Sequence, residues 1–547
     1  MRSPVGRVPI IGLLVLGALV LAEAGCGLGQ TGIDPSLDQI FWPAGLALDP
    51  EGNWLYVVNS NNDLRFNAGT LIAIDLQKAK RDREKLAADA GVESPDAGVA
   101  SPWPECSTTH FADDTAAETL ANTLDEPCCV DLLRPHVLNC NERAYVQTDA
   151  TVRIGSFGGE AAFQTYHRDP NDLNSELVGR IFMIVRAEPS ITFVDVTHGN
   201  GSVHMRCNGP RSEADPQLRN PSCDDNWRVR RPSGAAVTDN VLPEEPHSLA
   251  LDQALGILYV SHLTIAVNRQ VVGGGISTIN IGSLLDPNAP NVVGSLLDPN
   301  APNVINSIAR VVFPTSLDQG VTALTLNKPG DPNDPNDPNY LLFAVARTSP
   351  DITGMVLQCQ NKGQHCDPND LTSRDLSLVP GEQITSSAFL PSGTDVRGFL
   401  LSPDGNQAYV LHRNSPDVTT STDPAALIVL DRTPDLNGEP ANRTSAILEI
   451  CAGASHMQFH DAGRGSLLYI TCFEGGQIYV VDPQAPLVKA IIEAGHGPTA
   501  LTFSPTEPIA FVADYADNDV AVIDLEPGSP TEYMVVQRLG FPHAVTQ

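Results

Sequence analysis

Five histidines and one aspartate of this 547-residue chain occupy matching places in a repeated strand pattern. Neutral imidazoles and carboxylates are ordinary ligands of divalent cations, and histidine also exchanges protons near neutral pH. If these side chains meet at one place, they predict a site for a divalent cation or for acid–base chemistry. The six residues are His247, His262, His412, His456, His496 and Asp514.

The cysteines point to disulfides rather than to metal sites. No Cys-x-x-Cys pair occurs, which argues against zinc ribbons, and no Cys-x-x-Cys-His occurs, which excludes covalent c-type haem. Adjacent cysteines cannot easily bond each other, so Cys128 and Cys129 are expected to take Cys106 and Cys140 as partners. Three further pairs are expected: Cys207 with Cys223, Cys359 with Cys366, and Cys451 with Cys472.

The N-terminus has the pattern of an export signal over residues 1–25. A basic start is followed by an apolar run over residues 8–22, which is short for a membrane span but suits a signal sequence. The end of this segment resembles a bacterial lipobox, which predicts lipidation of Cys26 and a flexible tether over residues 26–39. Cleavage by ordinary signal peptidase after Ala24 is the alternative. The chain is thus expected at the outer membrane or cell surface through a lipid anchor alone, or else in the periplasm or medium.

Composition excludes several functions. There are 33 Lys and Arg against 65 Asp and Glu, which gives a net charge of −32. A nucleic-acid-binding protein needs clustered positive charge, so nucleic acid is excluded as a partner. The 42% apolar content is too high for a disordered chain. No Gly-x-Ser-x-Gly, His-Glu-x-x-His or P-loop motif is present.

One pattern recurs seven times and must position the six candidate residues. It consists of an alternating apolar run, a turn, a run with an aromatic residue, and a third apolar run that usually ends in Asp. Strict alternation is typical of strands, and four-stranded units of about 40–50 residues are typical of propeller blades. The copies begin near residues 43, 179, 246, 321, 396, 454 and 498. The closing residues Asp75, Asp195, Asp431, Asp482 and Asp524 are expected to cap the turns that follow them.

These strands resemble the YVTN family of β-propeller repeats. The match is Tyr56-Val57-Val58-Asn59, with Tyr-Val pairs beginning at Tyr259, Tyr409 and Tyr479. The resemblance implies an all-β fold: a seven-bladed β-propeller of four-stranded blades with loop insertions. Residues 40–547 would form this single propeller, with insertions at about 77–178 and 197–244. The resemblance implies no particular activity, because such propellers include binding modules, cell-surface proteins and a few enzymes.

In propellers generally, the loops before the first strand and after the second strand of each blade surround one mouth of the channel. The resemblance therefore puts the six candidate residues at that mouth. They would form a divalent-cation site there, or they would be polar rim residues held apart by the width of the channel. Two functions follow: a scaffold that binds an envelope or extracellular protein or glycan, or a metal-dependent enzyme of the lactonase or lyase type.

Overall fold

The structure is a computed structural model of the whole chain. It describes residues 33–90, 103–106, 127–167, 177–199, 201–208, 221–223, 227–230, 242–253, 256–267, 270–281, 308–312, 320–327, 341–347, 351–359, 374–385, 395–413, 425–436 and 438–540. The predicted signal, Cys26 and the first half of the predicted tether lie outside these ranges. No helix in the described ranges is long and apolar enough to cross a membrane.

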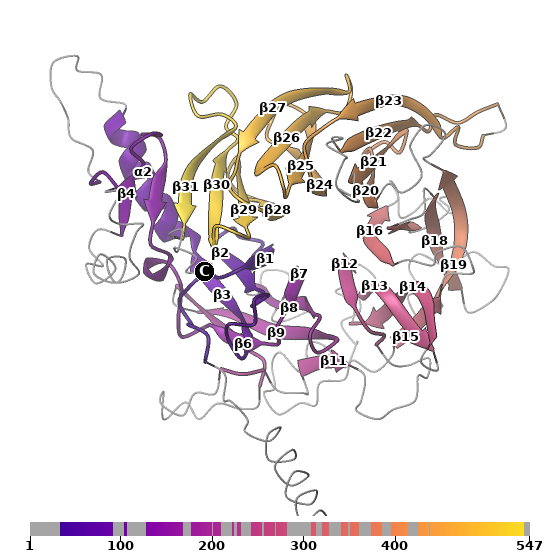
Figure 1. Cartoon of the computed structure of the whole chain (residues 1–547), viewed down its shortest axis with the longest axis horizontal. Coiled ribbons are helices and arrows are strands. Elements are labelled where there is room, and N and C mark those ends of the chain that lie inside the picture. Colours follow the sequence, from indigo (N-terminus) through magenta and orange to yellow (C-terminus); the bar gives the residue numbers. More distant parts are fainter. Residues whose placement is uncertain are drawn as a thin grey trace, which may run out of the picture.

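The chain is a seven-bladed β-propeller (Figure 1). Each blade is an antiparallel sheet whose strands follow one another in chain order. The first strands of neighbouring blades contact each other all the way around the ring. These first strands therefore surround the central channel, and the later strands lie progressively farther out. The predicted fold class is confirmed.

The strands of blades 1 to 7 are, in order: β1 (Pro43–Leu48), β2 (Trp54–Asn59), β3 (Gly69–Asp75) and β6 (Val152–Ile154); β7 (Gly158–His167), β8 (Leu177–Val185), β9 (Ser190–Gly199) and β10 (Ser202–Arg206), with β11 (Arg228–Arg230) also paired to β9; β12 (Pro246–Asp252), β13 (Ile257–Val267), β14 (Gln270–Asn280) and β15 (Ile308–Val312); β16 (Val321–Asn327), β17 (Leu341–Ala346), β18 (Asp351–Cys359) and β19 (Arg374–Thr385); β20 (Asp395–Leu401), β21 (Gln407–Arg413), β22 (Ala426–Asp431) and β23 (Arg443–Glu449); β24 (Ala454–Asp461), β25 (Ser466–Cys472), β26 (Gln477–Asp482) and β27 (Leu487–Glu493); β28 (Pro498–Phe503), β29 (Ile509–Asp514), β30 (Asp519–Asp524) and β31 (Met534–Leu539).

A buried aromatic side chain marks the second strand of every blade. It lies three residues before the residue that pairs with the start of the first strand. Each of the seven is at most 1% exposed, so a large apolar surface is removed from water in each blade. They are Tyr56, Phe182, Tyr259, Phe343, Tyr409, Tyr469 and Phe511.

The closing aspartates cap turns in four blades, as expected. The Asp75 carboxylate accepts a backbone N–H at 2.9 Å from Lys78 in helix α2 (Leu76–Ala90), and Asp431, Asp482 and Asp524 accept the N–H two residues on. Asp195 differs, because it is buried and receives the Arg180 Nε–H at 2.6 Å. That strand position therefore holds a buried ion pair in blade 2.

Some blade strands lie inside the segments that the sequence assigned to insertions. The segment 77–178 contains β6 and β7, and the segment 197–244 contains β10 and β11. Strands β6, β10 and β11 span only three to five residues each, too few to show the alternation of the repeat. The rest of the first segment contributes α2, β4 (Cys128–Val130), β5 (Leu138–Cys140) and a short 3₁₀ turn (Glu142–Ala144).

Candidate functional site

The first strand of every blade has a β-bulge at its channel-mouth end. The pairing register shifts just after the residue that opposes the end of the second strand. A bulge leaves a residue unpaired and redirects its side chain, and bulges concentrate next to functional sites. The shifts fall between Pro43 and Gly45, Gly158 and Ala161, Pro246 and Leu249, Val321 and Ala323, Val396 and Gly398, Ala454 and His456, and Pro498 and Ala500.

A second repeated feature fixes the backbone at this mouth. In six blades a residue of the second-strand segment donates its N–H to the carbonyl of the residue before the first strand; the donor follows the second strand in five of these blades and lies within β13 in blade 3. The donor and acceptor pairs are Ser60 and Trp42, Arg186 and Phe157, Leu263 and Glu245, Arg347 and Gly320, Phe473 and Gly453, and Tyr515 and Gly497. All six acceptors have positive φ, between 48° and 74°, and three of them are not glycine. Such strain is tolerated where the surrounding structure enforces it, and it clusters at functional sites.

This backbone frame presents four arginines on one side of the mouth. Arg186, Arg347 and Arg413 occupy the position after or at the end of the second strand in blades 2, 4 and 5, and Arg397 occupies the bulge of blade 5. We call these four residues the arginine sector. Arg186 and Arg347 directly follow apolar second-strand runs in the sequence, and that spacing is a signal from which they could have been found.

Acidic side chains only partly neutralise the arginine sector. Asp395 accepts the Nε–H and an Nη–H of Arg397 at 2.9 and 2.6 Å, and its carboxylate lies 3.5 Å from Nε of Arg347. Arg413 pairs with Glu474 at 2.6 Å. Within the described residues, Arg186 has no hydrogen-bonded or ion-paired partner for its side chain. Four guanidinium groups thus face two carboxylates, and the Arg347 side chain is half exposed.

His247 experiences the positive charge of the arginine sector. Burial and the positive charges of Arg186, Arg397 and Arg347 lower the pKa of His247 to about 3. His247 lies in the bulge of blade 3, so groups from blades 2, 4 and 5 reach it together. It hydrogen-bonds the backbone of Thr322, and its Nδ1 atom is buried with no partner within the described ranges. The imidazole is therefore neutral at physiological pH.

The opposite side of the mouth is aromatic. Trp42, Phe473 and Tyr515, from blades 1, 6 and 7, form what we call the aromatic sector. The rings of Trp42 and Tyr515 lie 5.0 Å apart, and those of Phe473 and Tyr515 lie 6.0 Å apart. Phe473 and Tyr515 stand at the same backbone position as Arg186 and Arg347 in the other blades. The same backbone position therefore carries opposite chemistry on the two sides.

Three of the six predicted site residues are buried below the mouth. His262, His412 and Asp514 occupy equivalent ends of second strands, each opposite the start of its first strand. Both ring nitrogens of His262 are within hydrogen-bonding distance of protein oxygens, with Glu244 O at 3.0 Å and Ser277 Oγ at 2.9 Å. Burial lowers the pKa of His412 to about 4. Asp514 pairs with Arg538 at 3.2 Å, and burial raises the pKa of this carboxyl.

The other three predicted residues lie on or above the first strands. His247 belongs with the arginine sector, and burial lowers the pKa of His456 on β24. His496 is largely exposed and lies 2.8 Å from Asp517. Across the described part of the chain, no three His, Cys, Asp or Glu side chains are grouped so that they could hold a metal ion. The divalent-cation site stays a prediction without a described geometry.

Four of the expected disulfides are present. They are Cys106–Cys129, Cys128–Cys140, Cys207–Cys223 and Cys451–Cys472. The expected bond between Cys359 and Cys366 involves a residue outside the described ranges. Disulfides are typical of proteins that fold in oxidising compartments, so the four bonds are compatible with export.

Comparisons with known proteins give likeness of fold only. No family model matches the chain, and no curated protein matches its sequence. Hydrazine synthase from Kuenenia stuttgartiensis is 10% identical with a TM-score of 0.44, and the match covers 91% of this chain and 98% of that one. A putative 6-phosphogluconolactonase from Bacteroides fragilis is 12% identical, with a TM-score of 0.40 and 84% and 86% of the chains covered. A periplasmic gluconolactonase from Pseudomonas aeruginosa is 12% identical, with a TM-score of 0.39 and 83% and 86% covered. These likenesses are too distant to carry an argument about activity.

Proposed function

We propose that the chain is an exported, lipid-anchored propeller that binds a small organic anion in the arginine sector. The observation that carries this proposal is that Arg347 and Arg397, from two neighbouring blades, both lie within 3.5 Å of the single carboxylate of Asp395. The charges of Arg186, Arg347 and Arg397 also act together on His247. Guanidinium groups bind carboxylates and phosphates through paired, charge-assisted hydrogen bonds. Among the residues that the structure describes, no carboxylate fully engages the donors of Arg186 and Arg347, so a ligand carboxylate would have partners there.

The charge of the rest of the chain makes this cluster unusual. With 33 basic and 65 acidic residues, most of the surface repels anions. A local cluster of one sign raises the local concentration of its counter-ion. The ligand that this favours is compact, because a large polyanion would also meet the acidic surface outside the mouth. A small anion therefore replaces the protein or glycan partner expected from the sequence.

Thermal shift with a charge series tests the proposal. Acetate, succinate and citrate are added at constant ionic strength, and Tm is measured for the native protein, for Arg347→Ala and for Arg443→Ala. Arg443 lies on the outer strand of blade 5, away from the mouth, and is exposed, so it is the matched control. We expect stabilisation that grows with ligand charge, persists in Arg443→Ala and is lost in Arg347→Ala. Equal shifts in both variants, or none in the native protein, would contradict the proposal.

An enzyme that acts on an anionic substrate, of the lactonase or lyase type, is the second candidate. His247 favours it, because a neutral imidazole among guanidinium groups can accept a proton beside a bound carboxylate. Turnover of a lactone panel that is lost in His247→Gln, with anion binding retained, would support this reading. Metal analysis of the purified protein tests the predicted divalent cation separately.

The lipid anchor has its own test. Full-length protein and Cys26→Ser are expressed in a bacterial host and partitioned into detergent. Cys26→Ser is expected to move from the detergent phase to the aqueous phase. Equal partitioning of the two proteins would contradict lipidation.

A further inference from the structure

One of the seven blade junctions has no covalent connection across it. The chain runs from each blade directly into the next, but blade 7 ends at Leu539 and blade 1 begins at Pro43. All four strands of blade 1 come from residues 43–154, and β28 to β31 of blade 7 come from residues 498–539. The ring must therefore close through non-covalent contacts at this junction.

The inner part of the junction resembles the others. The Thr499 hydroxyl in the bulge of blade 7 donates to the Pro43 carbonyl at 3.1 Å, as the Thr322 hydroxyl donates to the Val396 carbonyl at 2.8 Å between blades 4 and 5. The Trp42 N–H also donates to Asn518 Oδ1 at 2.7 Å. These bonds are of the same kind as those at another junction, and they supply no chain connection.

The outer part of the junction is different, because a segment of blade 1 extends the sheet of blade 7. Strand β5 pairs in parallel with β31, and β4 pairs with β5, which makes a six-stranded sheet. The Gly540 N–H then donates to the Cys140 carbonyl at 3.0 Å. We call α2, residues 103–106 and residues 127–145 the clasp. The clasp leaves blade 1 after β3 and returns to it at β6, so it ties blade 7 to blade 1.

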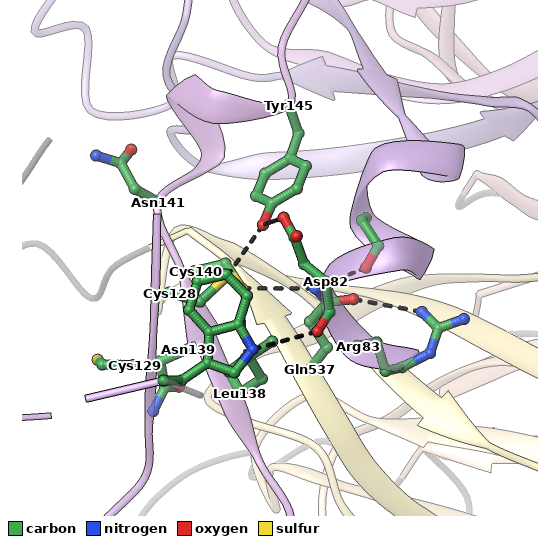
Figure 2. Close-up of a disulfide and its surroundings, with 12 residues drawn as sticks. Asp82, Arg83, Cys128, Cys129, Leu138, Asn139, Cys140, Asn141, Tyr145 and Gln537 are labelled. Carbon is green, nitrogen blue, oxygen red and sulfur yellow. Dashed lines mark hydrogen bonds between the residues drawn. A yellow bond between two sulfur atoms is a disulfide. The ribbon is translucent and has the colours of Figure 1, made fainter. Parts of the chain in front are cut away.

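Helix α2 reinforces this attachment to blade 7. Lys80 and Arg83 reach the carboxylate of Glu507, in the turn before β29, at 2.8 and 3.1 Å. The Gln537 side chain of β31 donates to the Ala79 carbonyl at 3.2 Å and accepts from Arg83 at 3.3 Å. Figure 2 shows Arg83 and Gln537 side by side beneath the clasp disulfide. The contacts join residues more than 400 positions apart in the chain.

Two disulfides hold the clasp together. Cys128–Cys140 joins β4 to β5, and Cys106–Cys129 joins the segment around Cys106 to β4. Each of these strands has only three residues, and so short a pair is not stable in water by itself. Beside the first disulfide, the Tyr145 hydroxyl donates to Asp82 of α2 at 2.9 Å (Figure 2). The two disulfides therefore fix the conformation of the segment that β31 and α2 contact.

We propose that these two disulfides are the latch that closes the propeller ring. Oxidation fixes the clasp and locks blade 7 to blade 1, and reduction releases this junction while the six chain-connected junctions hold. The reductant is a dithiol: its thiolate attacks one sulfur, a mixed disulfide forms, and the second thiol displaces it. Each clasp disulfide gains two electrons and two protons and becomes two thiols, and the dithiol leaves as a cyclic disulfide. The ring is thus completed only where cysteines are oxidised.

Hydrogen exchange measured by mass spectrometry tests the latch. The protein is compared with Cys128→Ser/Cys140→Ser and with the control Cys451→Ser/Cys472→Ser, which removes a disulfide between the segment that joins blades 5 and 6 and the end of β25. In the clasp variant we expect at least tenfold faster exchange in β31 and β1, with β13 and β21 unchanged. The control variant is expected to affect exchange in blades 5 and 6, with β31 and β1 unchanged. Unchanged exchange in β31 and β1, or an equal increase in all seven blades, would overturn the proposal.

A second measurement tests the proposal on the native protein, in case the clasp variant does not fold. Native oxidised protein is titrated with dithiothreitol, and thiols are mapped by alkylation while exchange is followed. Exchange in β31 and β1 is expected to rise with the reduction of Cys128 and Cys140, before any change in β21. Reduction of these cysteines without that rise would overturn the proposal.

Discussion

The two sides of the channel mouth have the same backbone and opposite side chains. On both sides a second strand ends with an N–H donated to a carbonyl of positive φ, and the first strand bulges beside it. Blades 2 and 4 place Arg186 and Arg347 there, whereas blades 6 and 7 place Phe473 and Tyr515. The aromatic rings contact one another within the protein, whereas the arginines retain N–H donors for a ligand. The repeat therefore provides the frame, and single residues at equivalent positions decide where a ligand binds.

The largest expected effect comes from breaking the frame that the two sides share. Phe343→Ala removes a ring below the arginine sector, and Tyr469→Ala removes a ring below the aromatic sector. Both rings are fully buried in the native protein. Each substitution leaves a cavity and is expected to lower the free energy of unfolding by about 3–5 kcal/mol. Urea unfolding checks this. A loss under 1 kcal/mol at either position would show that the two sides do not share one frame.

The second expected effect is a difference in citrate affinity between substitutions in the arginine sector and in the aromatic sector. Arg397→Ala removes a guanidinium and also frees Asp395, which then faces Arg347 alone. A hydrogen bond to a charged group contributes about 1.5–3 kcal/mol, so citrate affinity is expected to fall about tenfold to a hundredfold. Fluorescence or calorimetric titration measures this. Tyr515→Leu, on the other side, is expected to change the affinity less than twofold.

The third effect is a pH dependence confined to the arginine side. His247 has a pKa of about 3 in the folded chain, below the 6.5 of a free histidine, so the unfolded chain takes up the proton first. The contribution of neutral His247 to stability is complete above pH 6.5 and is lost as the pH falls from 6.5 toward 3. A bound anion counters the arginine charges and reduces this loss. His247→Gln should remove that part of the acid sensitivity in thermal scans, whereas His496→Gln should leave it unchanged.

The fold was predictable from the sequence because its signal is repeated. Aromatic residues of the second strands and closing aspartates recur along the chain. Their recurrence predicts the blades and the order in which the blades follow one another. The ends of the insertions were not predictable, since β6, β10 and β11 are too short to show a period. The clasp was also missed, because its parallel pairing with β31 joins residues about 400 positions apart.

The register of the candidate residues was predictable from the repeat, whereas the predicted site itself stays a prediction. The sequence placed six residues at one mouth by register, and the pairings confirm that register for His262, His412 and Asp514. Register does not show which residues are buried, and these three point into the protein interior. His247 and Arg397 lie in the bulges of blades 3 and 5, and no residue pattern in a single blade reveals those bulges.

The smallest expected effect concerns the aromatic sector alone. Tyr515→Leu removes a half-buried ring that touches Trp42 and Phe473. Aromatic pairs contribute about 0.5–1.5 kcal/mol beyond burial, so a modest drop in stability is expected. Thermal unfolding measures it, and a loss above 3 kcal/mol would mean that this sector supports the frame.

Calorimetric titration of citrate into native protein and into the Arg347→Ala/Arg397→Ala double variant, at fixed ionic strength, tests the central claim most directly. The claim is that the arginine sector makes an anion site in a chain whose net charge is −32. The account predicts saturable binding at one site in the native protein and a loss of affinity of at least about tenfold in the double variant. Equal affinity in the two proteins would contradict it.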